Sequence, residues 1–202
     1  MKICALPHIR WNPVPRPRKP SLAEIFGEAS GGDTLNLPLH WRDPYHVFVA
    51  TALDLFAQDD AFVHAVFDVM ARAVHHEFQV ETARSDRLRQ LGPQLAWRPN
   101  IWMGVSVASQ DDLARVDDLL RSGARVRFAH LVGPVAVGQS DLVGIDFVMV
   151  EGANADQHPG LHGACTAAGC RLFMGSSETA DEQVLPASTT HALWMPRRGG
   201  RR

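Results

Sequence analysis

The chain alternates between two kinds of apolar pattern, and this alternation limits the folds open to it. Short runs rich in β-branched and aromatic residues are typical of strands, and residues 47–51 (VFVAT), which lack polar alternation, are typical of a strand buried on both faces of a parallel sheet. Between these runs, apolar residues recur every three or four positions, as on one face of a helix. Six runs are predicted to be strands: residues 47–51, 78–82, 101–107, 126–129, 146–150 and 171–174.

The segments between the predicted strands carry helix start and stop signals. A first helix is predicted after Asp59, with apolar residues repeating as far as Val74. Ser85 opens a second, shorter helix that Gly92 and the following proline end. The third begins at Ser109 with a capping-box-like pattern. A further helix is predicted between Pro159 and Gly169, whereas the glycine-rich residues 131–144 allow only a short one.

Strands separated by helices need crossover connections, which place the strands parallel in one sheet. The fold class is therefore α/β, and we expect a partial (β/α) barrel of about six strand-helix units. An open doubly wound parallel sheet is the alternative, because it gives a similar sequence pattern. We divide the chain into an irregular N-terminal segment 1–36, a barrel domain 37–178 and a C-terminal extension 179–202 with a basic tail.

Composition places the chain among folded proteins without a strong charge bias. It has 202 residues, 46% of them hydrophobic, and a formal net charge of -2. No apolar run approaches the roughly 20 residues of a membrane-spanning helix. The first residues lack the pattern of a secretory signal, and the cysteine count of 3 is odd, so we expect a cytoplasmic location and no membrane partner.

Basic residues are concentrated near the two ends of the chain. They are Arg16, Arg18, Lys19, Arg197, Arg198, Arg201 and Arg202. Arginine-rich tails can bind the phosphate backbone of a nucleic acid, but short basic tails are more often solvated termini. We expect a small-molecule or protein partner instead.

Seven segments resemble an uncharacterised family of bacteriophage proteins. They are residues 11–14 (WNPV), 39–56 (LHWRDPYHVFVATALDLF), 78–84 (FQVETAR), 100–107 (NIWMGVSV), 127–128, 146–150 and 165–169 (CTAAG), in the same order and spacing. The resemblance covers most of residues 11–174. It implies a radical-SAM-like partial (β/α) barrel with a cysteine-bound iron–sulfur cluster.

The cysteines that the resemblance implies are missing. In the family, the WNPV segment leads into three closely spaced cysteines, where this chain has PRPRKPSLAEIF. Cys4, Cys165 and Cys170 have no spacing that could hold a [4Fe–4S] cluster. Ala83 stands where the family has lysine, and residues 151–154 (EGAN) replace a Gly-Gly-Glu-Ser run. We expect a degenerate, phage- or prophage-related pseudoenzyme that binds a ligand or protein and needs no cofactor.

Polar side chains follow the predicted strands and should meet at one mouth of the barrel. They are Asp54, Glu81, Arg84, Ser106, His130, Glu151 and Asn154. Carboxylates and a histidine can act as general acid and base, so the alternative function is a non-radical enzyme using Asp54, Glu81, Arg84, His130 and Glu151, one version of which depends on zinc. Polar strand ends without catalysis are the competing interpretation. Asp54 and Arg84 lie inside the resembling segments and rank first as pocket residues.

A second set, His158, His162, Cys165 and Cys170, has side chains that suit zinc. The first three are spaced to share one helical face. However, Gly160 and Gly163 weaken that helix, and both cysteines can equally be small buried hydrophobes. Our expectation is therefore that no metal is bound.

Overall fold

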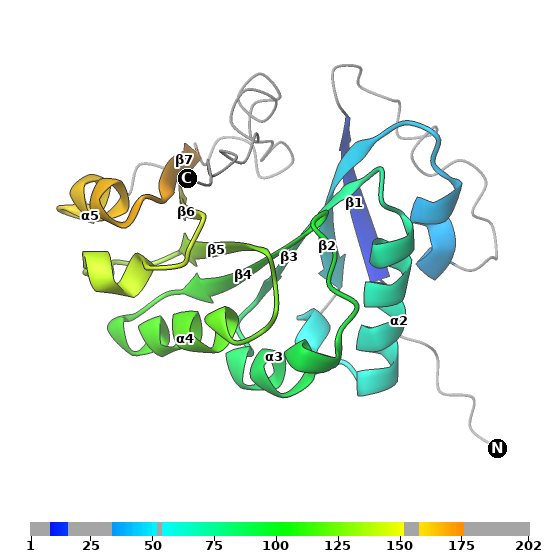
Figure 1. The fold of residues 1–202 in the computed structure, drawn as a ribbon, viewed down its shortest axis with the longest axis horizontal. Helices are drawn as coiled ribbons and strands as arrows, with labels where there is room; N and C mark the ends of the chain where they lie inside the picture. Colours follow the sequence, from blue (N-terminus) through cyan, green and yellow to red (C-terminus); the bar gives the residue numbers. More distant parts are fainter. Residues whose placement is uncertain (1–8, 16–33, 52–53, 152–157, 176–202) are drawn as a thin grey trace, which may run out of the picture.

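In the computed structural model, one sheet curls into a half-barrel and helices run along its outer side (Figure 1). The structure describes residues 9–15, 34–51, 54–151 and 158–175; of residues 9–15, 34, 50–51, 151 and 175 it describes the backbone alone. The seven strands follow one another across the sheet in chain order. This arrangement brings the ends of all the parallel strands to one curved edge.

Six parallel strands confirm the six that the sequence predicts. They are β2 (Tyr45–Thr51), β3 (Glu77–Thr82), β4 (Ile101–Val107), β5 (Val126–Leu131), β6 (Phe147–Glu151) and β7 (Arg171–Gly175). A further strand, β1 (Ile9–Pro15), pairs antiparallel with β2 and was not predicted. It contains Pro13 and Pro15, which cannot donate to a ladder, and it lies at the edge of the sheet, where proline is tolerated.

Within the residues that the structure describes, four α-helices and five short 3₁₀ helices accompany the strands. The α-helices are α2 (Asp60–Arg72), α3 (Ser85–Leu91), α4 (Ala114–Leu120) and α5 (Leu161–Ala168). The 3₁₀ helices are η1 (Thr34–His40), η2 (Leu55–Ala57), η3 (Gly92–Gln94), η4 (Gln110–Leu113) and η5 (Gln139–Leu142). Asp59 caps α2 as predicted, accepting a 2.9 Å hydrogen bond from the Phe62 N–H. The helix ends at Arg72, so Val74 lies outside it and is 66% exposed.

Two apolar layers lie on opposite faces of the sheet. Because side chains alternate along a strand, Ile101 and Met103 of β4 face the helices and join the main core, whereas Trp102 faces the concave side. There Trp102 packs with Phe128 and Phe147 in a separate aromatic cluster. The sequence pattern of uninterrupted apolar runs follows from this burial on both faces.

The strand order excludes the open doubly wound alternative. A doubly wound sheet reverses its strand order at a switch point and carries helices on both faces. Here the order runs from β1 to β7 without reversal, and the described helices lie on the convex side (Figure 1). The doubly wound prediction is wrong, because each crossover returns on the same side and adds the next strand at the same edge.

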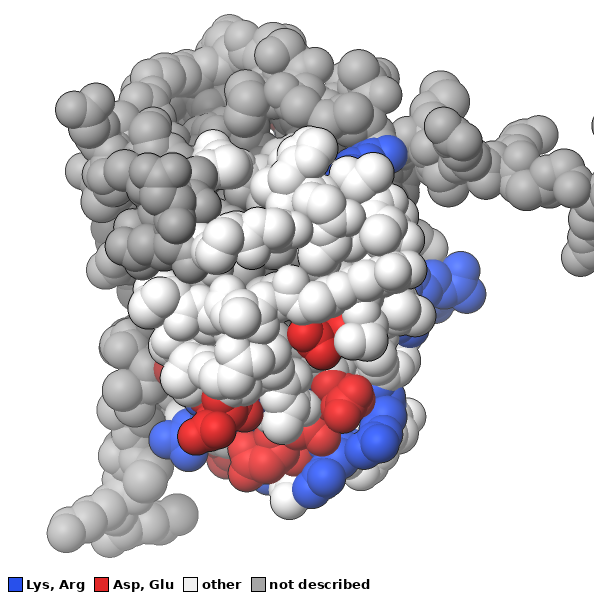
Figure 2. All heavy atoms as spheres, turned by 90° about the vertical axis from the view of Figure 1, so that its left-hand side faces the viewer, with Lys and Arg blue, Asp and Glu red and all other residues white. Residues whose placement is uncertain are grey.

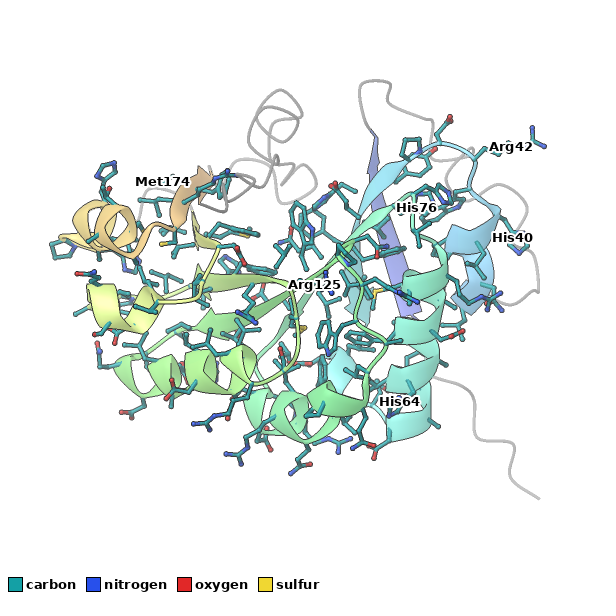
Figure 3. The ribbon with its side chains drawn as sticks, in the orientation of Figure 1. His40, Arg42, His64, His76, Arg125 and Met174 are labelled. Carbon is teal, nitrogen blue, oxygen red and sulfur yellow. The ribbon has the colours of Figure 1, made fainter. Side chains whose placement is uncertain are left out.

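At the amino-terminal edge of the parallel strands, His76 holds η1 against the end of α2 (Figure 3). The ring accepts a 3.1 Å hydrogen bond at Nδ1 from the Tyr45 N–H and donates from Nε2 to the Pro38 carbonyl at 2.9 Å. Burial, followed by the neighbouring His75, lowers the pKa of His76 from 6.5 to about 4. His76 is therefore a neutral structural residue. None of the described helices is long and apolar enough to cross a membrane.

Candidate functional site

Strand β3 carries a polar stripe along the concave face of the half-barrel. Its sequence EFQVET alternates, so that Phe78 and Val80 enter the main core while Glu77, Gln79 and Glu81 take the opposite face. Gln79 is only 3% exposed, and Glu81 lies nearest the carboxyl end of the strand. A buried polar stripe needs hydrogen-bond partners, and neighbouring strands supply them.

At the carboxyl-terminal edge, Glu81 of β3 meets His130 of β5. The Nδ1 atom of His130 lies 3.1 Å from each oxygen of the Glu81 carboxylate. The side chain of His130 is 10% exposed and that of Glu81 is 34% exposed. The pair therefore joins two strands of the half-barrel and keeps its carboxylate accessible to a ligand.

Gly104 of β4 makes this contact across an intervening strand possible. In the sheet, Gly104 lies between Glu81 and Phe128, its register partners on β3 and β5. A Cβ atom at position 104 would stand 2.1–2.4 Å from the Phe128 ring, so only glycine leaves room for that ring beside β4. The Phe128 ring stacks on Phe147 with centroids 5.0 Å apart and forms an aromatic floor.

Deeper in the half-barrel, Gln79 links three strands. Its Oε1 lies 3.1 Å from Nε2 of His46 on β2, and its Nε2 donates to the Met149 sulfur of β6 at 3.4 Å. His46 also approaches Glu77, with 3.4 Å between Nδ1 and a carboxylate oxygen. These contacts hold Glu77 and Gln79 of the polar stripe against β2 and β6.

Asp54 ties the ends of β2 and β3 together through its carboxylate. One oxygen accepts from the Phe56 N–H at 2.9 Å, both accept from the Thr82 hydroxyl at 2.7 and 2.8 Å, and the other accepts from the Ala83 N–H at 2.8 Å. Its acceptor positions are thus used by neighbouring loops. We assign Asp54 a structural role at the edge of the site.

The other predicted strand-end residues are arranged separately. The Arg84 side chain is exposed at the start of α3, while its N–H donates to Thr82 Oγ1 at 2.9 Å. Ser106 is half-buried, and its carbonyl accepts from Arg115 at 2.7 Å. Glu151 ends β6, but its side chain and all of Asn154 lie outside the described residues. The structure therefore brings Glu81 and His130 into contact, and Arg84 contacts neither.

Residues 23–164 match the model of one protein family, described as a protein of unknown function, DUF5131. The chain belongs to the DUF5131 family. The match includes Glu81, His130 and the polar stripe of β3, and it ends before Cys165. No curated protein and no solved structure matches the chain.

In this DUF5131 member, the four residues considered as zinc ligands, His158, His162, Cys165 and Cys170, lie apart from the Glu81–His130 pair. His158 is buried, with Nδ1 3.1 Å from the Val135 carbonyl, whereas His162 is exposed. Cys165 and Cys170 belong to the main core on the helix side of the sheet. Within the described ranges, no three His, Cys, Asp or Glu residues are grouped as metal ligands.

The two described cysteines also fail to fit an iron–sulfur cluster. Cluster binding needs thiolates. Burial, together with a hydrogen bond to Cys170, raises the pKa of Cys165 to about 12, and burial raises the pKa of Cys170 as well. The end of α5 accounts for their position: Gly169 has a left-handed conformation with φ 76°, and the Cys170 N–H returns to the Cys165 carbonyl at 3.0 Å. Both thiols are therefore suited to packing.

Sequence reasoning missed the supporting residues His46, Gln79, Gly104 and Met149. One signal was available, because EFQVET places polar residues at alternate positions within a strand expected to be buried on both faces. The partners of those polar residues depend on strand register across the sheet. A local pattern does not contain that information.

Proposed function

We propose that this DUF5131 member binds a small ligand on the concave face of its half-barrel, at the Glu81–His130 pair. The observation that carries the proposal is the contact of His130 Nδ1 with both oxygens of a carboxylate that stays 34% exposed. Ligand sites in barrels of parallel strands lie at the carboxyl ends of the strands, where this pair is found. Specific sites combine an apolar surface with a few fixed polar groups.

The surroundings of the pair supply that apolar surface. Met149 and Phe173 are half-buried and pack against the cluster of Trp102, Phe128 and Phe147. The polar stripe of β3 and the stacked rings hold Glu81 and His130 before any ligand arrives. Such preorganisation lowers the entropy that binding must otherwise offset.

In this proposal the protein works without an iron–sulfur cluster and without zinc. Its resemblance to radical-SAM-like phage proteins then reflects the scaffold, and the protein is a cluster-free, phage- or prophage-related pseudoenzyme. The positions and raised pKa values of Cys165 and Cys170 support this, because neither offers a thiolate at the concave face. Purified protein should be colourless and contain neither iron nor zinc in stoichiometric amount. A stoichiometric metal in protein prepared without chelator would contradict this part.

Ligand binding can be tested with a mixed set of amines, carboxylic acids, nucleosides and sugars by saturation-transfer NMR. We compare the wild type with a Glu81→Ala, His130→Ala double variant and with Asp68→Asn, which changes an exposed carboxylate on α2. The proposal expects at least one compound class to bind the wild type and Asp68→Asn but not the double variant. Equal saturation-transfer signals from all three proteins for every compound would contradict the proposed binding site.

A second function, acid–base catalysis, rests on the same pair. A carboxylate bonded to a histidine holds the ring in one orientation and stabilises its protonated form, as in hydrolytic enzymes. The two functions differ in one measurement. If a compound found in the screen is converted by the wild type and not by His130→Ala, the pair is catalytic; an unchanged compound leaves it a binding pair.

A further inference from the structure

We infer that the group recognised by Glu81 is a single ammonium, carried on a small apolar or aromatic body. This inference rests on the proposed binding function and names its ligand class. It follows from the acceptor positions still open on Glu81, from the position of His130, and from the apolar side chains beside the pair.

Glu81 has acceptor capacity that the fold does not use. A carboxylate offers about four lone-pair positions. Among the described residues, the hydrogen-bond partner of Glu81 is His130, whose Nδ1 is 3.1 Å from both oxygens. Asp54 and Asp112 at the same edge differ, because backbone N–H groups occupy their carboxylates: Ala83 and Phe56 for Asp54, and Ala108 and Ser109 for Asp112.

The position of His130 decides between kinds of cation. A guanidinium or amidinium binds a carboxylate as a fork, with two parallel N–H groups approaching both oxygens from their shared side. Nδ1 of His130, equidistant from the two oxygens, already occupies that side. The remaining lone pairs point outward from separate oxygens. One ammonium, which can direct a single N–H at either oxygen, fits this arrangement better than a planar fork.

Carboxylates already cap several helix N-termini at this edge, although α3 and α5 begin without a side-chain cap. In barrels of parallel strands these termini attract phosphates and carboxylates through their unpaired N–H groups. Here Asp54 bonds the Phe56 N–H at 2.9 Å, Asp59 bonds that of Phe62 at 2.9 Å, and Asp141 bonds that of Gly138 at 2.8 Å. Burial raises the pKa of Asp112, but the Ala108 N–H, the hydroxyl and N–H of Ser109 and the nearby Arg115 outweigh it and lower the pKa, so this carboxylate is ionised at neutral pH.

Charged residues of both signs lie at this edge, so the apolar side chains beside the pair decide the rest of the ligand. Figure 2 shows the side toward which β4 and β5 point, with Asp and Glu gathered over its lower part at the level of α4 and with Lys and Arg beside them. Met149 of β6 is the register partner of His130, and Phe173 of β7 is that of Met149. Both side chains are half-buried and can contact the body of the ligand.

Four small probes of similar size test the inference by titration at low salt and neutral pH: benzylamine, benzamidine, benzyl alcohol and benzoate. Benzylamine should bind most tightly, and Glu81→Gln should weaken it at least tenfold, because a charge-assisted hydrogen bond is lost. Asp68→Asn should leave its affinity unchanged. His130→Ala should strengthen benzamidine relative to benzylamine, because it frees the shared side of the carboxylate.

Several outcomes would overturn the inference. One is benzoate, benzyl alcohol or benzamidine binding the wild type as tightly as benzylamine; another is benzylamine affinity that survives Glu81→Gln. If a compound of another class binds the wild type but not the Glu81→Ala, His130→Ala double variant, the inference about the ammonium is wrong and the proposed binding function still holds. Circular dichroism of each variant confirms that it is folded, and His130→Ala tests the same geometry if Glu81→Gln does not fold.

Discussion

His76 and His130 are both buried and hydrogen-bonded, yet they occupy opposite edges of the half-barrel and have different partners. His76 is 1% exposed and bonds two backbone groups, the Tyr45 N–H and the Pro38 carbonyl. His130 bonds the carboxylate of Glu81, a side chain that reaches solvent. A histidine whose nitrogens are both used by the backbone stays neutral at neutral pH and serves the fold. A histidine paired with an accessible carboxylate can respond to a ligand.

The largest expected effect is the loss of stability in His76→Ala. The variant leaves the Pro38 carbonyl and the Tyr45 N–H without their partner and opens a cavity beside Trp41, whose ring centroid is 5.5 Å from that of His76. We expect a loss of roughly 3–4 kcal/mol in the free energy of unfolding, measured with urea. His75→Ala, which removes one hydrogen bond from an exposed ring to the Trp41 carbonyl, should cost about 1 kcal/mol or less. If His130→Ala lowered the free energy of unfolding as much as His76→Ala, His130 would also be a structural residue, and the proposed difference between the two histidines would be wrong.

The pH dependence of stability should carry the signature of His76. Its pKa is lowered from 6.5 in the unfolded chain to about 4 in the folded protein, so the unfolded state binds more protons between these values. The stabilisation is fully present above pH 6.5 and is lost as the pH falls toward 4. A shift of this size corresponds to roughly 3 kcal/mol. In urea unfolding at a series of pH values, the difference between the wild type and His76→Ala should shrink over this interval. A constant difference would show that His76 titrates normally.

Gly104→Ala should disturb the concave edge from within. The added methyl group would meet the Phe128 ring at 2.1–2.4 Å, in a floor that is buried. We expect a loss of about 1–3 kcal/mol in urea unfolding, because overpacking displaces the ring, and reduced ligand binding because Glu81 and His130 meet across this position. Gly163→Ala in α5 is the matched control: its Cβ has no atom within 4 Å, and alanine should stabilise that helix by about 0.5–1 kcal/mol. Equal effects at both glycines would contradict the packing argument.

The sequence predicted the fold further than it predicted the site. The uninterrupted apolar run of β4 and the stop signals around it give that strand its correct bounds, Ile101–Val107. Pro13 and Pro15 argue against a strand at β1, because proline has no N–H to donate. The strand forms nevertheless, because it lies at the edge of the sheet, where proline is tolerated. Among the polar residues that follow the strands, the sequence favoured Asp54 and Arg84 as pocket residues, because they lie in the segments that resemble the phage family. The contact between Glu81 and His130 depends on register over 49 residues of chain and on the space at Gly104, and neither is visible in a local pattern.

The smallest expected effect is the coupling energy between Glu81 and His130, and its salt dependence separates the two edges most sharply. A double-mutant cycle with Glu81→Gln and His130→Asn should give about 0.5–1 kcal/mol, because one partner of the pair is 34% exposed and solvent screens it. High salt should reduce this coupling further, since screening acts on accessible charges. The loss caused by His76→Ala should change little with salt at neutral pH, because its partners are uncharged backbone groups. Coupling at the Glu81–His130 pair that is large and insensitive to salt would show that this pair, like His76, serves mainly to hold the fold together.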